Sequence, residues 1–519
     1  MAEGSGSSSE AKQPGWLKLV LPSIPDIIFV ALLTTLVFSF LAMRLLGDAD
    51  IGWQIRTGQL IWATRTIPHV DPYSSTITGK SWYAWEWLYD VTVGRLDTWM
   101  GLNGVVWFSA ILIAAAFGGL FHWLIRRRVS LCFAFALVLL AVASSMIHFL
   151  ARPHLVTWLF VWIWFVVLDA SERRGPCHPS TGTNWLWTLP LLMLVWVNAH
   201  GGFLLAFVLL GIFWLGALWD FFRARGQRTE DLLRRIEAVR RAKELTWLGL
   251  ANVVASFVNP YGWKLYAHIY SYLSDRFLMN HIQEFQSPDF HRIAQRCFLV
   301  LLLFTVGVLA VRGRQLPVSR LLVVLFAVYA GLYASRNIPV SSILLAMAIG
   351  PLVPKSSGGY LHRMGDLQAD LHGHLWPAAA VLFTAIVALH GGRVGSIAWM
   401  DARFDPKRMP AQAVDYLVQH EIRQPVLSPD SWGGYLIYRM YPERSVVVDD
   451  RHDLYGQAFF KSYLKLIRIE PGWQEFLNEH DVRCILFPRD SALASVLRQT
   501  PGWKSIYEDD LSVIFVRNP

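Results

Sequence analysis

Apolar runs long enough to cross a lipid bilayer recur over the first three quarters of this 519-residue chain. A helix needs about 20 apolar residues to span the hydrocarbon core. A soluble chain of this length seldom combines 54% hydrophobic with only 16% charged residues. The sequence therefore predicts a polytopic α-helical membrane protein with about eleven spans, at 27–46, 103–124, 131–149, 154–170, 184–198, 203–222, 245–258, 297–311, 318–334, 337–353 and 375–391.

The basic residues indicate how these spans are oriented. They concentrate in alternate loops, at 126–128, 173–174, 223–243 and 312–320. Cytoplasmic loops carry the excess of Lys and Arg, so we expect a cytoplasmic N-terminus and an extracytoplasmic C-terminus. The net charge of +9 is then a topology signal, and we expect no nucleic-acid partner. None of the four cysteines forms a CxxC pair, so we expect neither a zinc site nor a disulfide framework.

The composition divides the chain into three parts. Residues 1–26 are small and polar at their start and are predicted to be a disordered cytoplasmic N-terminus. Residues 27–398 form the predicted membrane domain, with a long first external loop at 47–102. Short strand and helix patterns alternate in residues 399–519 and predict an extracytoplasmic α/β domain. Its expected strands are PVLSP, SVVVDD, RCILFP and LSVIFVRNP, and its expected helices are PAQAVDYLVQHEI and EPGWQEFLNEH.

Asp48 and Asp50 stand directly after the first predicted span. Alternate carboxylates can bind a divalent cation such as Mg²⁺ or Mn²⁺ together, or one can act as a base while the other tunes it. The alternative is a helix end in water, where acids cost little. Because acids at the mouth of a membrane helix are costly to place, the position favours a function.

The same loop contains Asp71 and an aromatic segment, WYAWEWLYD, in which Glu86 follows Trp85. Tryptophans of this kind can anchor a protein at the headgroup level, or they can stack on a sugar ring. An interfacial anchor does not explain the carboxyl group of Glu86 among them. Glu86 is therefore a candidate catalytic residue, and Trp85 and Asp71 are candidates for contacting or supporting an acceptor.

Further polar clusters are predicted on the same external face. Arg suits bidentate binding of phosphate, so Arg152 with His154, and Arg336, are candidate phosphate ligands; the alternative is an Arg that reaches ordinary headgroups. The remaining candidates are less specific, because each also suits a cap, a turn or a solvated loop: His200 and Asn198 in WVNAHGGF, Glu284 with Asp289, and the acids and His452 in VVVDDRHDLYG. Glu284 could complete an acidic site with Asp50.

The arrangement resembles the GT-C superfamily of polyprenyl-phosphate-dependent glycosyltransferases. That superfamily includes protein O-mannosyltransferases, aminoarabinose transferases and catalytic subunits of oligosaccharyltransferases. The motifs DADIGWQIRTGQLI, ARPHL, WVNAHGGF, NPYG, EFQSPDF, SRNIP, WGGYL and DDRHDLYG are more closely similar to a little-characterised group of bacterial GT-C-like membrane proteins. A WWDYG-type acceptor motif is missing from the sequence, which argues against transfer to an asparagine.

The resemblance implies a transferase in a bacterial inner membrane, which moves a sugar from a polyprenyl-phosphate donor to a glycan, lipid or protein acceptor at the extracytoplasmic face. It implies that Asp50 is the base or a metal ligand beside Asp48. It also implies that Arg152 and Arg336 bind the donor phosphate, and we expect His154 and His200 to bind it with them. Asp71, Glu284, Asn198 and Trp85 would contact or support the acceptor. The alternatives are a polysaccharide polymerase or ligase, and a non-catalytic assembly or transport protein.

Overall fold

The computed structural model describes residues 17–173, 185–226, 228–353, 364–365, 367–368, 371 and 374–518. Cys177 and most of the N-terminal stretch predicted to be disordered lie outside the described residues. Within that stretch, the structure places a short helix, α1 (Leu17–Val20), and the start of α2 at Ile24. Ser23 caps α2 through a capping box with Asp26.

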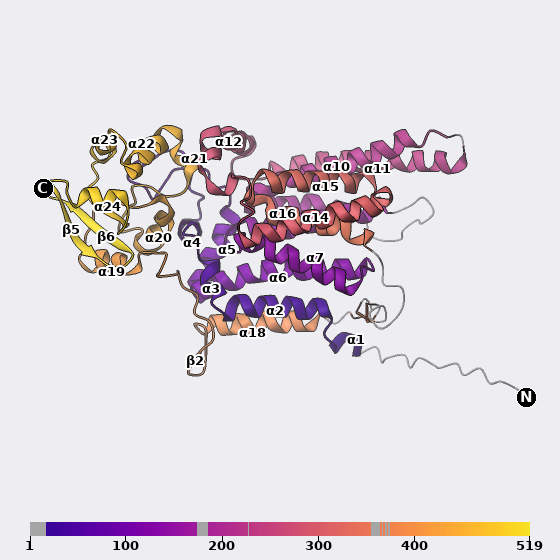
Figure 1. The fold of residues 1–519 in the computed structure, drawn as a ribbon, viewed down its shortest axis with the longest axis horizontal. Helices are drawn as coiled ribbons and strands as arrows, with labels where there is room; N and C mark the ends of the chain where they lie inside the picture. The colour runs from indigo at the N-terminus through magenta and orange to yellow at the C-terminus, as the bar shows by residue number, and fades with distance from the viewer. Residues whose placement is uncertain are drawn as a thin grey trace, which may run out of the picture.

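The membrane region is a bundle of roughly parallel helices (Figure 1). Each of the eleven predicted spans contains a helix: α2 (Ile24–Phe38), α6 (Leu102–Arg126), α7 (Leu131–Ser145), α8 (His154–Glu172), α9 (Leu189–Ala199), α10 (Leu204–Arg223), α11 (Thr229–Ser256), α14 (Ile293–Arg312), α15 (Val318–Tyr333), α16 (Ile338–Ile349) and α18 (Leu375–Leu389). Among the described residues, five helical stretches are long and apolar enough to cross a membrane, and four more are apolar but shorter. The chain is a multi-pass membrane protein.

Two predicted spans differ from the helices that the structure shows. The first, 27–46, is broken after Phe38, and a separate helix α3 (Leu41–Leu45) follows. The break comes at Ser39, which has an extended backbone and whose Oγ accepts a hydrogen bond from the Leu41 amide. The segment 245–258 forms the last part of the long helix α11. The first half of α11 is amphipathic and basic, and the helix continues from it into this segment without a break.

The end of the bundle away from the C-terminal region is held by buried ion pairs. Asp169 on α8 is fully buried and pairs with Arg127 and Arg320. The neighbouring Glu172 pairs with Arg241 of α11 at 2.9 Å. These contacts join α6, α8, α11 and α15 at one level, and the core helix α16 is buried along its whole length.

Helices α4 (Asp50–Thr64) and α5 (Trp87–Met100) lie where the bundle meets the C-terminal region (Figure 1). They cross in direct backbone contact at two glycines. A Cβ on Gly58 would lie 1.8 Å from the Asp90 carbonyl oxygen, and one on Gly94 would lie 2.7 Å from the Gln59 nitrogen. Any larger residue at either position would force the helices apart, so the pair is a rigid unit.

Short helices connect the bundle to this pair and to the C-terminal region. They are η1 (Met146–His148), η2 (Trp185–Thr188), η3 (Gly201–Phe203), α12 (Trp263–Ser274), α13 (Arg276–His281), η4 (Gln283–Phe285), η5 (Gly313–Gln315), η6 (Ser335–Asn337) and η7 (Gly350–Leu352). A hairpin of β1 (Arg393–Val394) and β2 (Ile397–Ala398) follows α18.

The C-terminal region contains a four-stranded mixed sheet of order β3-β4-β6-β5, in which only β3 and β4 are parallel. Its strands are β3 (Val426–Leu427), β4 (Cys484–Pro488), β5 (Trp503–Glu508) and β6 (Ser512–Arg517). Its helices are α19 (Ala411–Gln419), α20 (Asp430–Met440), α21 (His452–Tyr455), α22 (Gln457–Arg468), α23 (Trp473–Glu479) and α24 (Ala492–Leu497).

The prediction of a strand at SVVVDD is wrong, and β5 and helices α20 and α22 were not predicted. Val446 makes only isolated bridges, one to Val426 and one to Ser74 of the first loop. The first loop therefore takes the place of a regular sheet neighbour. Thr76 Oγ1 also donates to the Val447 carbonyl at 2.8 Å. These contacts join the first loop and the C-terminal region into one packed unit.

Candidate active site

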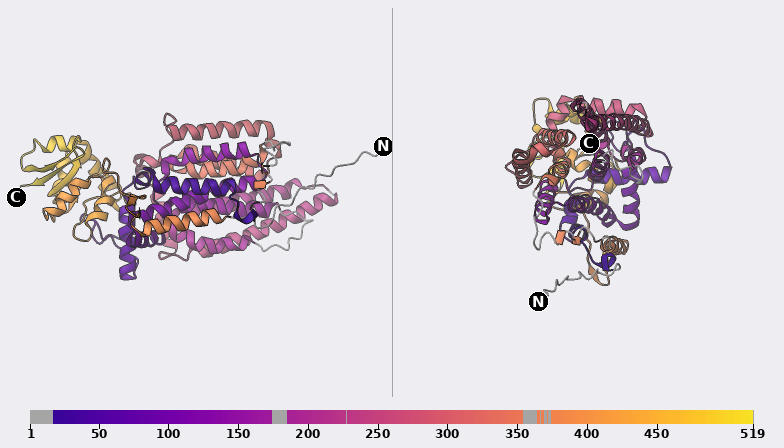
Figure 2. Two further views of the ribbon diagram at one scale, coloured as in Figure 1. Left: turned by 90° about the horizontal axis from the view of Figure 1, so that it is seen from below. Right: turned by 90° about the vertical axis from the view of Figure 1, so that its right-hand side faces the viewer.

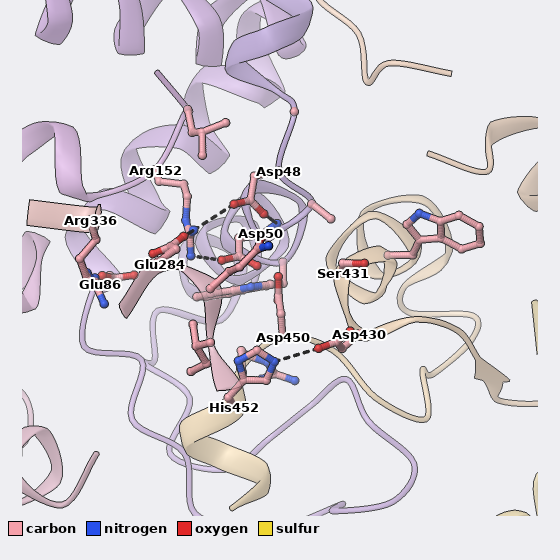
Figure 3. A pocket seen from close by; sticks show the side chains of 18 of the residues that line it. Asp48, Asp50, Glu86, Arg152, Glu284, Arg336, Asp430, Ser431, Asp450 and His452 are labelled. Atoms are coloured by element: carbon pink, nitrogen blue, oxygen red, sulfur yellow. Dashed lines mark hydrogen bonds and ion pairs between the residues drawn. The ribbon is translucent and has the colours of Figure 1, made fainter. Parts of the chain in front are cut away.

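A cavity of about 900 Å³ lies between the end of the helix bundle and the C-terminal region. Among the described residues, nine carboxyl side chains and five guanidinium groups line it, so its lining is strongly acidic. Seven of the site residues predicted from the sequence contribute to the lining: Asp48, Asp50, Trp85, Glu86, Arg152, Glu284 and Arg336. Figure 3 shows six of them with Asp430, Ser431, Asp450 and His452.

Asp48, Asp50 and Asp450 form the centre of this site. One carboxylate oxygen of each lies within 4.8 Å of the others. Asp50 opens helix α4, and its amide donates to Asp48 Oδ1 at 3.2 Å. Asp450 comes from the C-terminal region, directly after the buried segment that bridges to the first loop. Residues from both ends of the chain therefore meet here.

The donor set fits a hard divalent cation. Asp50 Oδ1 and Asp450 Oδ1 are both buried, and neither has a hydrogen-bond partner among the described residues. Buried carboxylate oxygens are seldom left unpaired, because the cost is several kcal/mol. Burial and the nearby Asp48 raise the pKa of Asp450 to about 7. Three carboxylates, two of them with an unpaired buried oxygen, are ligands of the kind that Mg²⁺ or Mn²⁺ prefers.

Arg152 provides the positive charge next to this cluster. Its Nη1 donates to Asp48 Oδ2 at 2.9 Å and to Glu284 Oε1 at 2.6 Å, and its Nη2 donates to Asp50 Oδ2. Burial would raise the pKa of Glu284, but Arg152 and Arg336 more than offset it and hold that pKa well below its usual range. Arg152 was predicted to bind phosphate, yet here it binds three carboxylates.

Arg336 lies on η6 and lines the same cavity, but its contacts differ from those of Arg152. Its guanidinium stacks on the ring of Phe285, 4.5 Å from the ring centroid. It forms no ion pair or hydrogen bond with any described side chain or carbonyl. Its N–H edges are therefore free, and a guanidinium in this state suits an anionic ligand such as phosphate.

Glu86 lies at the start of α5, directly before Trp87. Gln54 Nε2 donates to Glu86 Oε2 at 3.3 Å, and His200 Nε2 lies 3.7 Å from Oε1. Burial raises the pKa of Glu86 to about 7, although Arg152 and Arg336 partly oppose this shift. Such a carboxyl group can exchange a proton at neutral pH.

His200 supports Glu86 and does not line the cavity. Its Nδ1 accepts a hydrogen bond from the Gly202 amide at 3.1 Å and lies 2.7 Å from Thr157 Oγ1. Burial, together with the positive charges of Arg336 and Arg152, lowers the pKa of His200 to about 3. The neutral ring must then carry its proton on Nε2, which faces Glu86.

Three other predicted site residues also lie outside the cavity lining. Asp71 is buried and pairs with Arg451 at 2.8 Å. His154 Nε2 donates to the His148 carbonyl at 2.9 Å. Asn198 accepts a hydrogen bond from Trp87 Nε1 at 2.7 Å and donates to two backbone carbonyls. Each is bonded within the protein, so these residues stabilise the surroundings of the site.

The sequence pattern around VVVDDRHD was singled out only weakly, yet this segment completes the site. Arg451 is buried between Asp71 and Asp449, and its guanidinium lies 4.7 Å from the centroid of Trp82. His452 Nε2 lies 3.0 Å from Asp430 Oδ2 on the cavity wall. The signal that could have found this segment is the same as for Asp48 and Asp50: acids that follow directly on a buried apolar run.

Comparison with known proteins supports the fold. No family model matches the chain, and no curated protein matches it in sequence. The archaeal oligosaccharyltransferase AglB from Archaeoglobus fulgidus, solved with an inhibitory peptide and a dolichol-phosphate, is similar with a TM-score of 0.53 at 12% identity, over 94% of this chain and 73% of AglB. ArnT from Cupriavidus metallidurans, solved in the apo state, matches with a TM-score of 0.48 at 14% identity, over 94% of this chain and 97% of ArnT. The predicted similarity to GT-C membrane glycosyltransferases is confirmed at the level of the fold.

Proposed function

We propose that this chain, a multi-pass membrane protein with a fold similar to that of AglB, transfers a sugar from a polyprenyl-phosphate donor to an acceptor in the cavity. One observation supports this proposal above the others. A cluster of three carboxylates, in which Asp50 and Asp450 each have a buried oxygen without a hydrogen-bond partner among the described residues, shares one cavity with Arg336, which forms no ion pair with a described side chain. AglB was solved with a dolichol-phosphate, which is a lipid phosphate of the proposed class.

In this proposal Arg336 binds the phosphate of the donor. Its free N–H edges face a cavity that lies at the end of the bundle, where a lipid phosphate would be when its tail lies between helices. As the bond between sugar and phosphate breaks, negative charge grows on the leaving phosphate. A positioned guanidinium stabilises that charge more than it stabilises the ground state.

Asp48, Asp50 and Asp450 would hold a divalent cation. When bound, that cation would place further positive charge beside the leaving phosphate. Arg152 holds Asp48 and Asp50 in position through the bonds described above. Asp50 is central because it belongs to the carboxylate cluster and also pairs with Arg152.

Glu86 would take the proton from the acceptor hydroxyl. A general base works best when its pKa lies near the working pH, and it contributes about 10²- to 10⁴-fold to the rate. The pKa of Glu86, about 7, meets this condition. Gln54 and the neutral His200 keep its carboxyl group in one orientation.

A cellular experiment tests the proposal. The native host would carry wild type, Asp50→Asn or the control Asp289→Asn, which changes an exposed acid outside the cavity, all at matched membrane levels. We expect a polyprenyl-linked sugar to accumulate and one glycan product to disappear only with Asp50→Asn. If Asp50→Asn and wild type give the same lipid and glycan profiles, the proposed function is wrong.

A further inference from the structure

Four side chains at the far ends of α4 and α5 form a continuous stack of alternating Arg and Trp. The Arg65 guanidinium carbon lies 4.1 Å from the Trp62 ring centroid, and that of Arg95 lies 4.2 Å from the same centroid. Arg95 also lies 4.7 Å from the Trp99 centroid. Trp62 and Trp99 are 40% and 57% exposed. We call these four residues the Arg–Trp stack.

The stack lies at the other end of the same two helices that supply the candidate site. Gln54 bonds to Glu86 near their starts, and Trp62 contacts Arg95 farther along, so α4 and α5 run in parallel away from the cavity. None of the four stack residues lines the cavity. The Arg–Trp stack is therefore a separate surface.

Its position is at the level where the bundle ends. Helix α5 ends at Met100, and the long apolar helix α6 begins at Leu102. Trp99 thus lies within one turn of the end of a membrane span. The left view of Figure 2 shows a purple helix of this pair at right angles to the bundle helices. A helix with this orientation runs parallel to the bilayer surface.

The chemistry of the stack suits an anionic headgroup. A guanidinium that stacks on an indole uses its face and leaves its N–H groups available in the plane. Among the described residues, no carboxylate pairs with Arg65 or Arg95, and Arg95 Nε has no hydrogen-bond partner. The nearest acid of α5, Asp97, is bonded instead to Gln59 and Tyr438. Two cations next to exposed indoles remain.

We propose that the Arg–Trp stack binds the phosphate of an anionic phospholipid in the leaflet on the cavity side. A phospholipid fits better than a free phosphate because exposed Trp62 and Trp99 alternate with the cations, and amphipathic indole rings favour the headgroup region. Since α4 and α5 are locked together at Gly58 and Gly94, this contact also fixes the height of Asp50 and Glu86 above the bilayer. The inference is independent of the proposed activity.

Native mass spectrometry of the purified full chain tests this proposal. Wild type, R65Q/R95Q and the control R423Q/R483Q would be titrated with dioleoylphosphatidylglycerol or dioleoylphosphatidylcholine. The control also removes two positive charges, but from exposed positions in the C-terminal region. A basic residue near an anionic surface contributes about 1 kcal/mol, and 1.4 kcal/mol is about tenfold. We expect R65Q/R95Q to weaken binding of phosphatidylglycerol by about 10- to 30-fold.

Binding of phosphatidylcholine should be the same in all three proteins. The proposal is overturned if R65Q/R95Q retains phosphatidylglycerol as tightly as wild type, or if both double variants lose it equally. It is also overturned if millimolar inorganic phosphate displaces the lipid from wild type, because a free phosphate would then be the ligand. If R65Q/R95Q does not fold, the exposed single variant R65Q should still weaken lipid binding by about 3- to 5-fold.

Discussion

Asp50, in the first loop, and Asp450, in the C-terminal region, each place one carboxylate oxygen within 4.8 Å of the other and of Asp48, and each has a buried oxygen without a hydrogen-bond partner among the described residues. The two residues are far apart in the sequence, and only the fold brings them together. The C-terminal region is therefore needed to complete the carboxylate cluster. It also stabilises the first loop through Arg451 and the bridge between Ser74 and Val446.

The first prediction concerns cation binding. Asp450→Asn should abolish the stabilisation of the protein by Mn²⁺ or Mg²⁺, because it removes one of three ligands. A ligand that binds only the folded state adds about 2.7 kcal/mol to the free energy of unfolding at 100 times its Kd. Thermal unfolding of the purified protein with and without the cation measures this effect. Wild type and Asp289→Asn should be stabilised equally; equal stabilisation of Asp450→Asn would show that the cluster does not hold the cation.

The second prediction concerns pH. Folded Glu86 keeps its proton up to about pH 7, whereas an ordinary Glu loses it near 4.5. The folded state therefore binds more protons than the unfolded state between these values, and the free energy of unfolding falls as the pH rises through this range. This fall in the free energy of unfolding is on the order of 3 kcal/mol, and Glu86→Gln should remove it.

The same variant separates a role in stability from a role in the reaction. If Glu86 is the base, the transfer rate of wild type rises across pH 7 as the carboxyl group ionises. Glu86→Gln should be slower by about 10²- to 10⁴-fold and should lose this pH dependence. A variant with the wild-type rate and pH profile would exclude Glu86 as the base.

The third prediction concerns the donor phosphate. Arg336→Gln should weaken binding of a polyprenyl phosphate by about 10- to 100-fold, because hydrogen bonds to charged groups contribute about 1.5–3 kcal/mol. Competition binding with a labelled polyprenyl phosphate measures the effect. The control Arg292→Gln changes an exposed arginine that does not line the cavity. Equal affinities in the two variants would argue against Arg336 as the phosphate ligand.

The fourth prediction concerns Arg451, which is buried between Asp71 and Asp449. Arg451→Gln leaves two buried carboxylates without their cation and should destabilise the protein by about 3–5 kcal/mol. Arg439→Gln removes a more exposed pair with Asp415 and should cost at most about 1 kcal/mol. Thermal unfolding compares the two. Limited proteolysis of Arg451→Gln should cut the first loop, and resistance equal to wild type would show that Arg451 does not hold this loop.

Much of the membrane region could be predicted from the sequence, because the length of an apolar run is a local signal. Each predicted span contains a helix, and Asp48 and Asp50 stand out as acids beside a membrane segment. The break at Ser39 could not be predicted, since the apolar run continues through it. The contact between Val446 and Ser74 could not be predicted either, because a strand pattern does not show which distant segment the strand will pair with.

The roles of individual side chains depended on the same long-range contacts. Arg152, His154 and Asn198 have the residue types of a ligand-binding site, but their partners are protein groups. Only the folded structure distinguishes Arg152, whose N–H groups are occupied by carboxylates, from Arg336, whose N–H groups are free. Seven residues singled out from the sequence line one cavity, but sequence reasoning could not tell these two arginines apart.

The most direct test of the account is a transfer assay with the purified protein in liposomes. These would contain a set of polyprenyl-phosphate-linked sugars, a lipid extract of the host as acceptor, and Mn²⁺ or Mg²⁺. Mass spectrometry would follow the loss of each donor and the appearance of free polyprenyl phosphate. The account predicts that wild type consumes one donor and releases polyprenyl phosphate, and that Asp50→Asn does not. If wild type leaves every donor intact, or if Asp50→Asn releases polyprenyl phosphate at the wild-type rate, the account is contradicted.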